Sequence, residues 1–158
     1  MRMILNVSVL FFLYLNKEIL ILEKIMELEM WNIFQTSRGA NATMILSVTI
    51  GIWIAARFAS VARENDAPVL MKAIISVFAL SGFAFGWMVI TRALNSWVVQ
   101  ASALSSLEES GTELSPLAGQ FVEMYGGEFL TNPGPIGMAY LISGLLIAIL
   151  PLWLKDNR

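Results

Sequence analysis

The side chains that could carry chemistry here are carboxylates, amines and hydroxyls, because the 158-residue chain contains no cysteine and no histidine. Thiolate zinc sites, cysteine-ligated iron–sulfur clusters, imidazole metal ligation and the commonest general base are therefore excluded. The nine methionines are typical packing residues in apolar helices. Carboxylate oxygens remain as ligands for hard cations.

Two carboxylates are the best candidates for such a role. Glu123 and Glu128 lie in the segment 95–133, and a metal-dependent membrane enzyme would need both to converge in one cleft. The competing interpretation, which we favour, is that both are solvated and need no partner. No calcium-loop spacing, G-x-S-x-G, H-E-x-x-H or phosphate-binding loop is present. We therefore expect a protein that is not an enzyme and uses no cofactor or metal.

A second set of residues has spacing suited to helix contacts. Gly82 and Gly86 form a G-x-x-x-G motif, and Ser47, Gly51 and Ala55 repeat small residues at the same interval. Small residues one turn apart let another helix backbone approach closely, which gains dispersion energy inside a membrane. These motifs predict helix packing, either within the bundle of this chain or against another subunit.

The elements that position these residues are long apolar runs. Hydrophobic residues make up 57% of the chain and charged residues only 14%, against about 25% in soluble domains. Crossing the bilayer takes roughly 20 apolar residues, and three runs qualify, at about 40–62, 69–92 and 134–154. The sequence predicts an all-α integral membrane protein with a three-transmembrane-helix bundle in residues 34–158. The net charge of −2 argues against nucleic-acid binding.

Residues 1–33 form a segment that is apolar or amphipathic and has three interpretations. Charged residues at 17, 18, 23 and 24 interrupt the apolar pattern. The segment is a fourth, short membrane helix, or an interfacial or signal-like helix, or an upstream extension of a chain that starts at Met26 or Met30. The residues alone leave these alternatives open.

Charge asymmetry predicts the orientation of the spans. Arg57, Arg63 and Lys72 flank the first connection, and Lys155 and Arg158 lie in the C-terminal tail. Short loops rich in lysine and arginine stay in the cytoplasm. We therefore expect a plasma or inner membrane protein with a cytoplasmic C-terminus and the segment 95–133 on the outer side.

The outer loop, residues 95–133, is predicted to be partly helical. Residues 95–107 have apolar side chains at helical spacing and extend the second helix. Ser115 and Pro116 then begin a helix over 116–125 that ends at Gly126. Its docking candidates are Leu117, Phe121, Glu123, Met124 and Tyr125.

The functional prediction is a non-catalytic accessory or scaffold subunit of a larger membrane complex. Its partners would be the lipid bilayer and other membrane subunits, with a hetero-oligomer favoured over a homo-oligomer. The alternative is a small homo-oligomeric channel or transporter. In that alternative, hydroxyls from Ser47, Thr49, Ser76 and Ser81 line a path between protomers.

Overall fold

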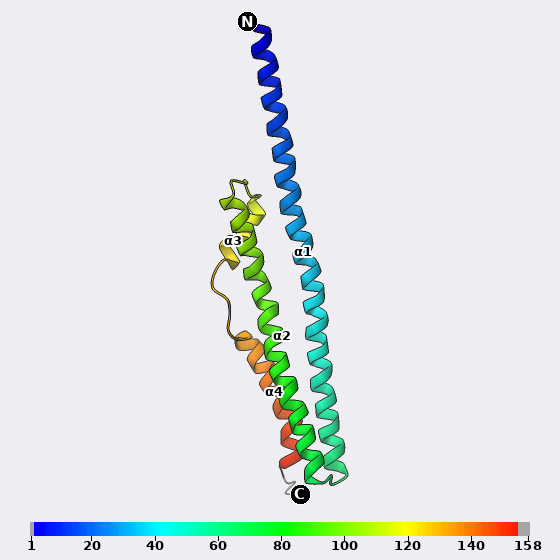
Figure 1. The fold of residues 1–158 in the computed structure, drawn as a ribbon. Helices are drawn as coiled ribbons and strands as arrows, with labels where there is room; N and C mark the ends of the chain where they lie inside the picture. The colour runs from blue at the N-terminus through cyan, green and yellow to red at the C-terminus, as the bar shows by residue number, and fades with distance from the viewer. Residues whose placement is uncertain (1, 155–158) are drawn as a thin grey trace. The chain divides into compact units, whose positions relative to one another are not determined.

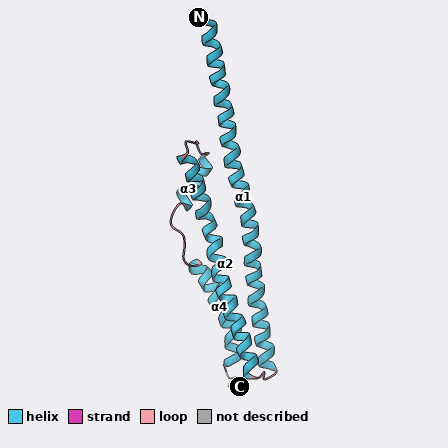
Figure 2. Cartoon of the chain, viewed as in Figure 1, coloured by secondary structure: helices cyan, strands magenta, loops and turns pink. Residues whose placement is uncertain are grey.

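The described residues 2–154 of the computed structural model form helices and short connections, and no strand occurs among them (Figures 1 and 2). The helices are α1 (Arg2–Glu64), α2 (Val69–Glu109), α3 (Pro116–Tyr125) and α4 (Gly134–Trp153). Side chains are described from residue 9 onward. The tail charges Lys155 and Arg158, which the orientation prediction uses, lie outside the described residues.

Three of these helices, α1, α2 and α4, are long and apolar enough to cross a membrane. This confirms an all-helical chain with three candidate spans. The apolar runs predicted at 69–92 and 134–154 begin where α2 and α4 begin, because Pro68 and Pro133 precede the two helices. The chain is therefore consistent with a membrane protein by helix length and composition.

The described chain contains no separate N-terminal helix, which corrects the alternative of a short fourth helix. α1 instead runs without a break from Arg2 to Glu64 and includes the predicted span at 40–62. The physical reason lies in residues 23–38, which contain strong helix formers such as Glu, Lys, Met and Leu and neither proline nor glycine. Charges at 17–24 interrupt an apolar run, but they do not end a helix.

The ends of α1 and α2 show why these helices stop where they do. After α1, the Ala67 N–H donates to the Ala62 carbonyl at 2.9 Å across Asp66, whose φ is 46°. After α2, Gly111 has φ 97°, and the Thr112 N–H donates to the Leu107 carbonyl. Both are left-handed helix endings, a backbone conformation that glycine and, less readily, aspartate tolerate.

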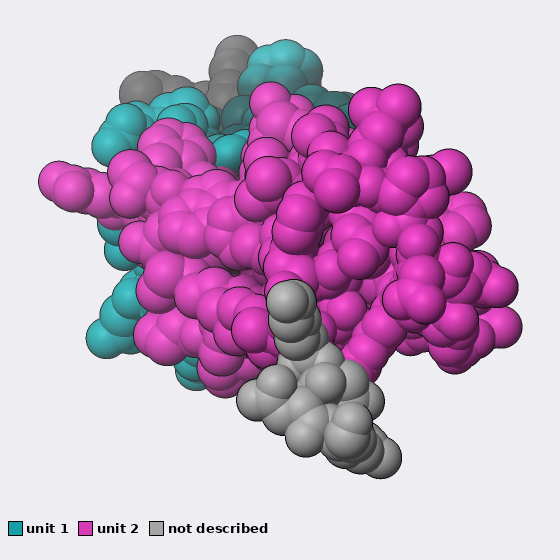
Figure 3. Space-filling model, turned by 90° about the horizontal axis from the view of Figure 1, so that it is seen from below, with its two compact units in different colours: residues 1–36, 97–127 teal, residues 37–96, 128–158 magenta. Residues whose placement is uncertain are grey.

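Contacts divide the chain into two units (Figure 3). Unit 1 contains residues 1–36 and 97–127, and unit 2 contains residues 37–96 and 128–158. The division at 36/37 falls inside α1, and the division at 96/97 falls inside α2. Each unit therefore has a core of its own, and the two are described separately.

Unit 2 packs parts of α1, α2 and α4 through three clusters of buried side chains. Each cluster takes residues from all three helices. They are Ala59, Ala62, Ile75 and Leu152; Ala55, Ala79 and Ala148; and Val48, Val89 and Leu141. The second cluster consists of alanine alone, so the helix backbones can approach closely there.

Unit 1 packs α3 and the second half of α2 against α1. Its buried hydrophobic residues are Phe34, Ala101, Leu104, Leu107 and Ala118, and Gln100 and Thr112 are buried as well. The prediction that the second helix continues past the apolar run is confirmed, since α2 extends to Glu109. The predicted helix at 116–125 is also confirmed as α3, with Ser115 as its N-cap and Gly126 as its C-cap.

Candidate interaction surfaces

An aromatic cluster forms one side of the unit 1 core. Trp31 and Phe34 of α1, Trp97 of α2, and Phe121 and Tyr125 of α3 lie with ring centroids 4.7–6.0 Å apart. The ring of Phe121 touches the rings of the other four residues. Edge-to-face and stacked aromatic pairs add to the stabilisation that comes from buried area alone. The cluster therefore holds α3 on α1 and α2.

A carboxylate fixes the N-terminus of α3 to α1. Glu27 accepts hydrogen bonds from the Ser115 hydroxyl at 2.6 Å, the Ser115 N–H at 3.0 Å and the Trp31 indole N–H at 3.2 Å. The Ser115 oxygen in turn accepts from the Ala118 N–H at 3.2 Å. Because the hydroxyl proton is directed to Glu27, the oxygen lone pairs are free to cap α3.

These contacts lower the pKa of Glu27 below its ordinary value of 4.5. Partial burial of the carboxyl raises the pKa, but the hydrogen bonds from Ser115 and Trp31 favour the charged form and outweigh it. Glu27 lies outside the predicted span at 40–62. Sequence analysis did not predict this site; the signal available was the four-residue spacing of Glu27 and Trp31, next to Phe34.

The predicted docking residues of α3 separate into two sets. Phe121 and Tyr125 belong to the aromatic cluster, so they are core residues of unit 1. Leu117 and Met124 are 68% and 70% exposed and lie on one side of α3 at a seven-residue spacing. Glu123 is also exposed. Of the five predicted docking residues, two are thus used inside the unit, and Leu117, Glu123 and Met124 remain exposed.

The two glycines of the G-x-x-x-G motif have different surroundings. A Cβ added at Gly86 would lie 2.5 Å from Leu141 Cδ2 and 2.9 Å from Val48 Cγ1, so Gly86 is required by packing inside unit 2. A Cβ added at Gly82 would meet nothing within 4 Å. The motif therefore serves the fold of this chain at one glycine and leaves the other open.

The small residues of α1 show the same division. Ala55 is 3% exposed and packs against Ala79 and Ala148. A Cβ at Gly51 would meet nothing within 4 Å, and Ser47 is exposed, with its hydroxyl bonded to the Thr43 carbonyl.

Gly51 and Gly82 both line one narrow crevice whose accessible volume is about 10 Å³. The crevice lies among α1, α2 and α4 and also includes Ile52, Phe83 and Gly144. A Cβ added at Gly144 would lie 2.9 Å from Ile52 side-chain atoms, so this third glycine is required by packing. The two glycines thus face the same gap between helices of unit 2, which core residues such as Ala55 and Leu141 also line.

Two of the four hydroxyls proposed to line a channel are bonded to a neighbouring helix. The Tyr140 hydroxyl donates to Thr49 Oγ1 at 2.7 Å, and the Trp153 indole N–H donates to Ser76 Oγ at 3.0 Å. Ser47 and Ser81 are exposed. These contacts connect α1 and α2 with α4 inside unit 2.

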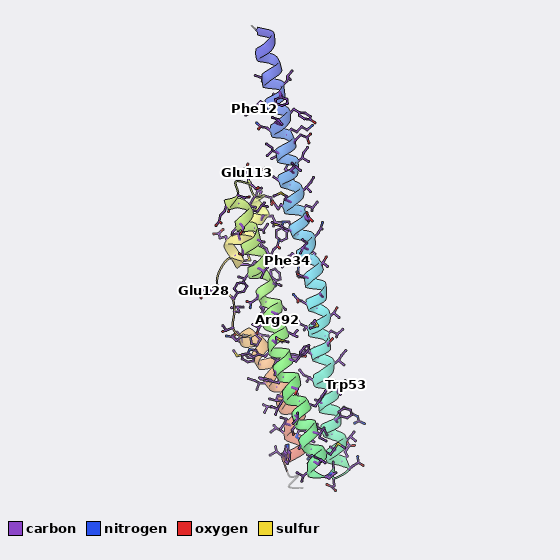
Figure 4. All side chains as sticks on the ribbon, in the orientation of Figure 1. Phe12, Phe34, Trp53, Arg92, Glu113 and Glu128 are labelled. Carbon is purple, nitrogen blue, oxygen red and sulfur yellow. The ribbon has the colours of Figure 1, made fainter. Side chains whose placement is uncertain are left out.

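The carboxylates considered for a metal site are both exposed, with Glu123 in unit 1 and Glu128 in unit 2. Within the described residues, no group of three or more Asp, Glu, His or Cys side chains is placed to hold a metal ion. Glu128 is labelled in Figure 4, and so is Arg92, which directly follows the uncharged residues 73–91 of α2.

Comparisons of the chain with known protein families, curated proteins and solved structures find no match.

Proposed function

We propose that the chain is a non-catalytic accessory or scaffold subunit of a larger integral membrane complex. The observation that carries this proposal is the open pair Gly51 and Gly82. Glycine in a helix interior costs about 0.5–1 kcal/mol of stability relative to alanine. At both positions a Cβ would meet nothing within 4 Å, so no contact within this chain requires glycine there. Close approach of a helix from another subunit would use the space that both leave.

The exposed part of α3 supports the same proposal. α3 is held in place by the aromatic cluster and by Glu27, so Leu117 and Met124 are presented on a fixed helix and not on a mobile loop. A rigid scaffold lowers the entropy cost of binding. We further propose that residues 95–133 lie on the outer side and that the C-terminus is cytoplasmic.

The contacts of Thr49 and Ser76 favour a subunit over a homo-oligomeric channel. Hydroxyls that line a pore must be free to hydrogen-bond water or a solute. These two instead accept hydrogen bonds from Tyr140 and Trp153 of the same chain. The channel alternative would therefore depend on Ser47 and Ser81 alone.

A substitution at Gly82 tests the proposal. The chain is extracted from its native membrane into nanodiscs, and the proteins that co-purify are quantified. Gly82→Leu should reduce a stoichiometric heterologous subunit at least about tenfold while the thermal unfolding of the chain itself changes little, because a bulky side chain blocks close helix approach. The matched control is Ala84→Leu, which changes an exposed position between the two glycines and should retain the partner.

If the heterologous subunit co-purifies equally with the Gly82→Leu and Ala84→Leu variants, the open glycines do not have the proposed role. A preparation that contains this chain alone, as a homo-oligomer, would favour the channel alternative.

A further inference from the structure

The three helices of unit 2 define the thickness of the apolar layer that this unit offers to a bilayer. α4 is uncharged over all of its 20 residues, which is about 30 Å of helix and matches the thickness of a hydrocarbon core. In α1, residues 39–56 are uncharged and Arg57 follows, and in α2, residues 73–91 are uncharged and Arg92 follows. Each helix taken alone is therefore long enough to cross.

The uncharged parts of α1 and α2 are staggered, because the two helices run antiparallel. Ser96 accepts a hydrogen bond from Asn41 at 3.4 Å, and Val48 packs beside Gly86. Arg92 is four residues before Ser96 and six residues after Gly86. These two contacts place Arg92 level with a point of α1 that is three to six residues before Val48.

The two arginines are consequently closer together along the helices than the two faces of a hydrocarbon core. Arg57 is nine residues after Val48, so it lies 12–15 residues from the level of Arg92, or about 18–22 Å at 1.5 Å per residue. A typical core is about 30 Å thick. Both arginines are exposed. The carboxylates described in unit 2 lie outside this layer, at positions 64, 66 and 128.

The direction of the two side chains places their charges still deeper. In an α-helix, each Cα–Cβ bond is tilted toward the N-terminus of its own helix. Because Arg57 and Arg92 each follow the uncharged run of their helix, both side chains leave the backbone toward the middle of the layer. Snorkelling toward the headgroups starts from this disadvantage, and a bilayer meets such a charge by local thinning.

We propose that Arg57 and Arg92 each bind a phospholipid phosphate, one in each leaflet, and that unit 2 thereby holds the bilayer around it thinner than about 30 Å. A guanidinium group binds phosphate oxygens through two parallel N–H donors. The inference takes α1, α2 and α4 as membrane spans. It goes beyond the proposed function, because it needs no other subunit.

A carboxylate of another membrane protein is the competing partner for these arginines. Such a carboxylate would itself lie near the hydrocarbon, where a charged side chain is costly. Phosphates, in contrast, line both faces of a phospholipid bilayer. Arg57 and Arg92 belong to different helices and lie at opposite edges of the layer, so the lipid accounts for both with one kind of ligand.

Bilayers of graded thickness test the proposal with the full-length protein. The chain is placed in nanodiscs of phosphatidylcholines whose acyl chains range from about 14 to about 22 carbons, and its thermal unfolding midpoint is measured. The midpoint should be highest in the short-chain lipids. Arg57→Leu combined with Arg92→Leu should move this maximum to chains longer by at least about two carbons, because the apolar layer then approaches about 30 Å.

Two control variants separate the charge of the arginines from their packing. Arg57→Lys combined with Arg92→Lys keeps both charges and should keep the maximum in short-chain lipids. Arg38→Leu combined with Lys72→Leu removes the same amount of charge from positions beyond the layer. This second pair should also leave the maximum in place.

Native mass spectrometry of protein released from the nanodiscs identifies the ligand. The wild-type chain should retain two phospholipids, and Arg57→Leu and Arg92→Leu should each retain one fewer. Adducts with the mass of inorganic phosphate, in buffer that contains it, would instead show that the arginines bind free phosphate, and they would overturn the assignment to lipid.

A maximum that stays at the same acyl length when both arginines are replaced by leucine would overturn the proposal. A maximum that moves equally in the Arg38 and Lys72 variant would do the same, and so would a crosslink from residue 57 or 92 to a carboxylate of another protein. These measurements require no heterologous subunit, so failure here is distinguishable from failure of the proposed function.

Discussion

At the scale of single residues, the two glycines of one motif differ in whether helices of this chain pack against them. Gly86 and Gly82 are one helical turn apart, yet only a Cβ added at Gly86 would meet side chains of its own unit within 4 Å, namely Leu141 and Val48. The sequence motif identifies both glycines as small, but it does not give the rotation of α2 relative to α1 and α4. That rotation depends on the packing of all three helices, so the inward glycine could not be predicted from spacing.

Alanine substitution at these two positions should therefore have opposite effects. Gly86→Ala overpacks a site where Leu141 is 1% exposed, and we expect a loss of about 1–2 kcal/mol in unfolding free energy. Gly82→Ala should be neutral or stabilising by up to about 1 kcal/mol, because the helix gains a better helix former and no clash. Thermal unfolding in detergent micelles compares the two, and equal destabilisation would contradict this assignment.

Glu27 gives unit 1 a pH dependence of known sign. Its pKa in the folded chain is lowered from 4.5, so the charged form contributes stability above that ordinary value, and this contribution is lost as the pH falls through the folded pKa. We expect the amides of α3 to lose hydrogen-exchange protection on acidification below about pH 4.5.

Glu27→Gln should lower the protection of α3 at neutral pH and flatten its acid dependence. Glu23→Gln changes a carboxylate one turn earlier on α1 that makes no such bond to Ser115, and it should retain the wild-type acid profile. An acid profile that is unchanged in Glu27→Gln would contradict the role assigned to this carboxylate.

At the scale of elements, the apolar runs at 69–92 and 134–154 predicted the starts of α2 and α4, and Ser115 with Pro116 predicted the start of α3. These boundaries depend on local chemistry, which a sequence contains. The unbroken α1 was not predicted, because the charges at 17–24 left three interpretations of residues 1–33 open, although no helix-stopping residue occurs there. The contact of Glu27 with Ser115 joins residues 88 positions apart, and no local pattern specifies it.

Attachment of α3 should depend on the aromatic cluster. Phe121→Ala removes contacts with Trp31, Phe34, Trp97 and Tyr125, and we expect it to weaken the docking of α3 by about 2–3 kcal/mol, less than for a fully buried ring. Hydrogen exchange should show faster exchange in α3 with little change in α4. Leu117→Ala is the matched control, since Leu117 is 68% exposed and its loss should leave α3 in place.

At the scale of the whole molecule, the chain presents more apolar surface than its own contacts cover. Leu117 and Met124 on α3 are exposed, and so are many apolar side chains of α1, α2 and α4. The exposed apolar surface of α2 and α4 is what two candidate spans would present to lipid. The glycines at 51 and 82 are small residues of the kind that lets helices approach closely.

The central claim is that this chain works as one subunit among different subunits. The most direct measurement is the native mass of the complex that contains it, after gentle extraction from its own membrane into nanodiscs, with identification of each polypeptide. The account predicts a stoichiometric assembly with at least one different membrane protein. A particle that contains only copies of this chain would contradict it.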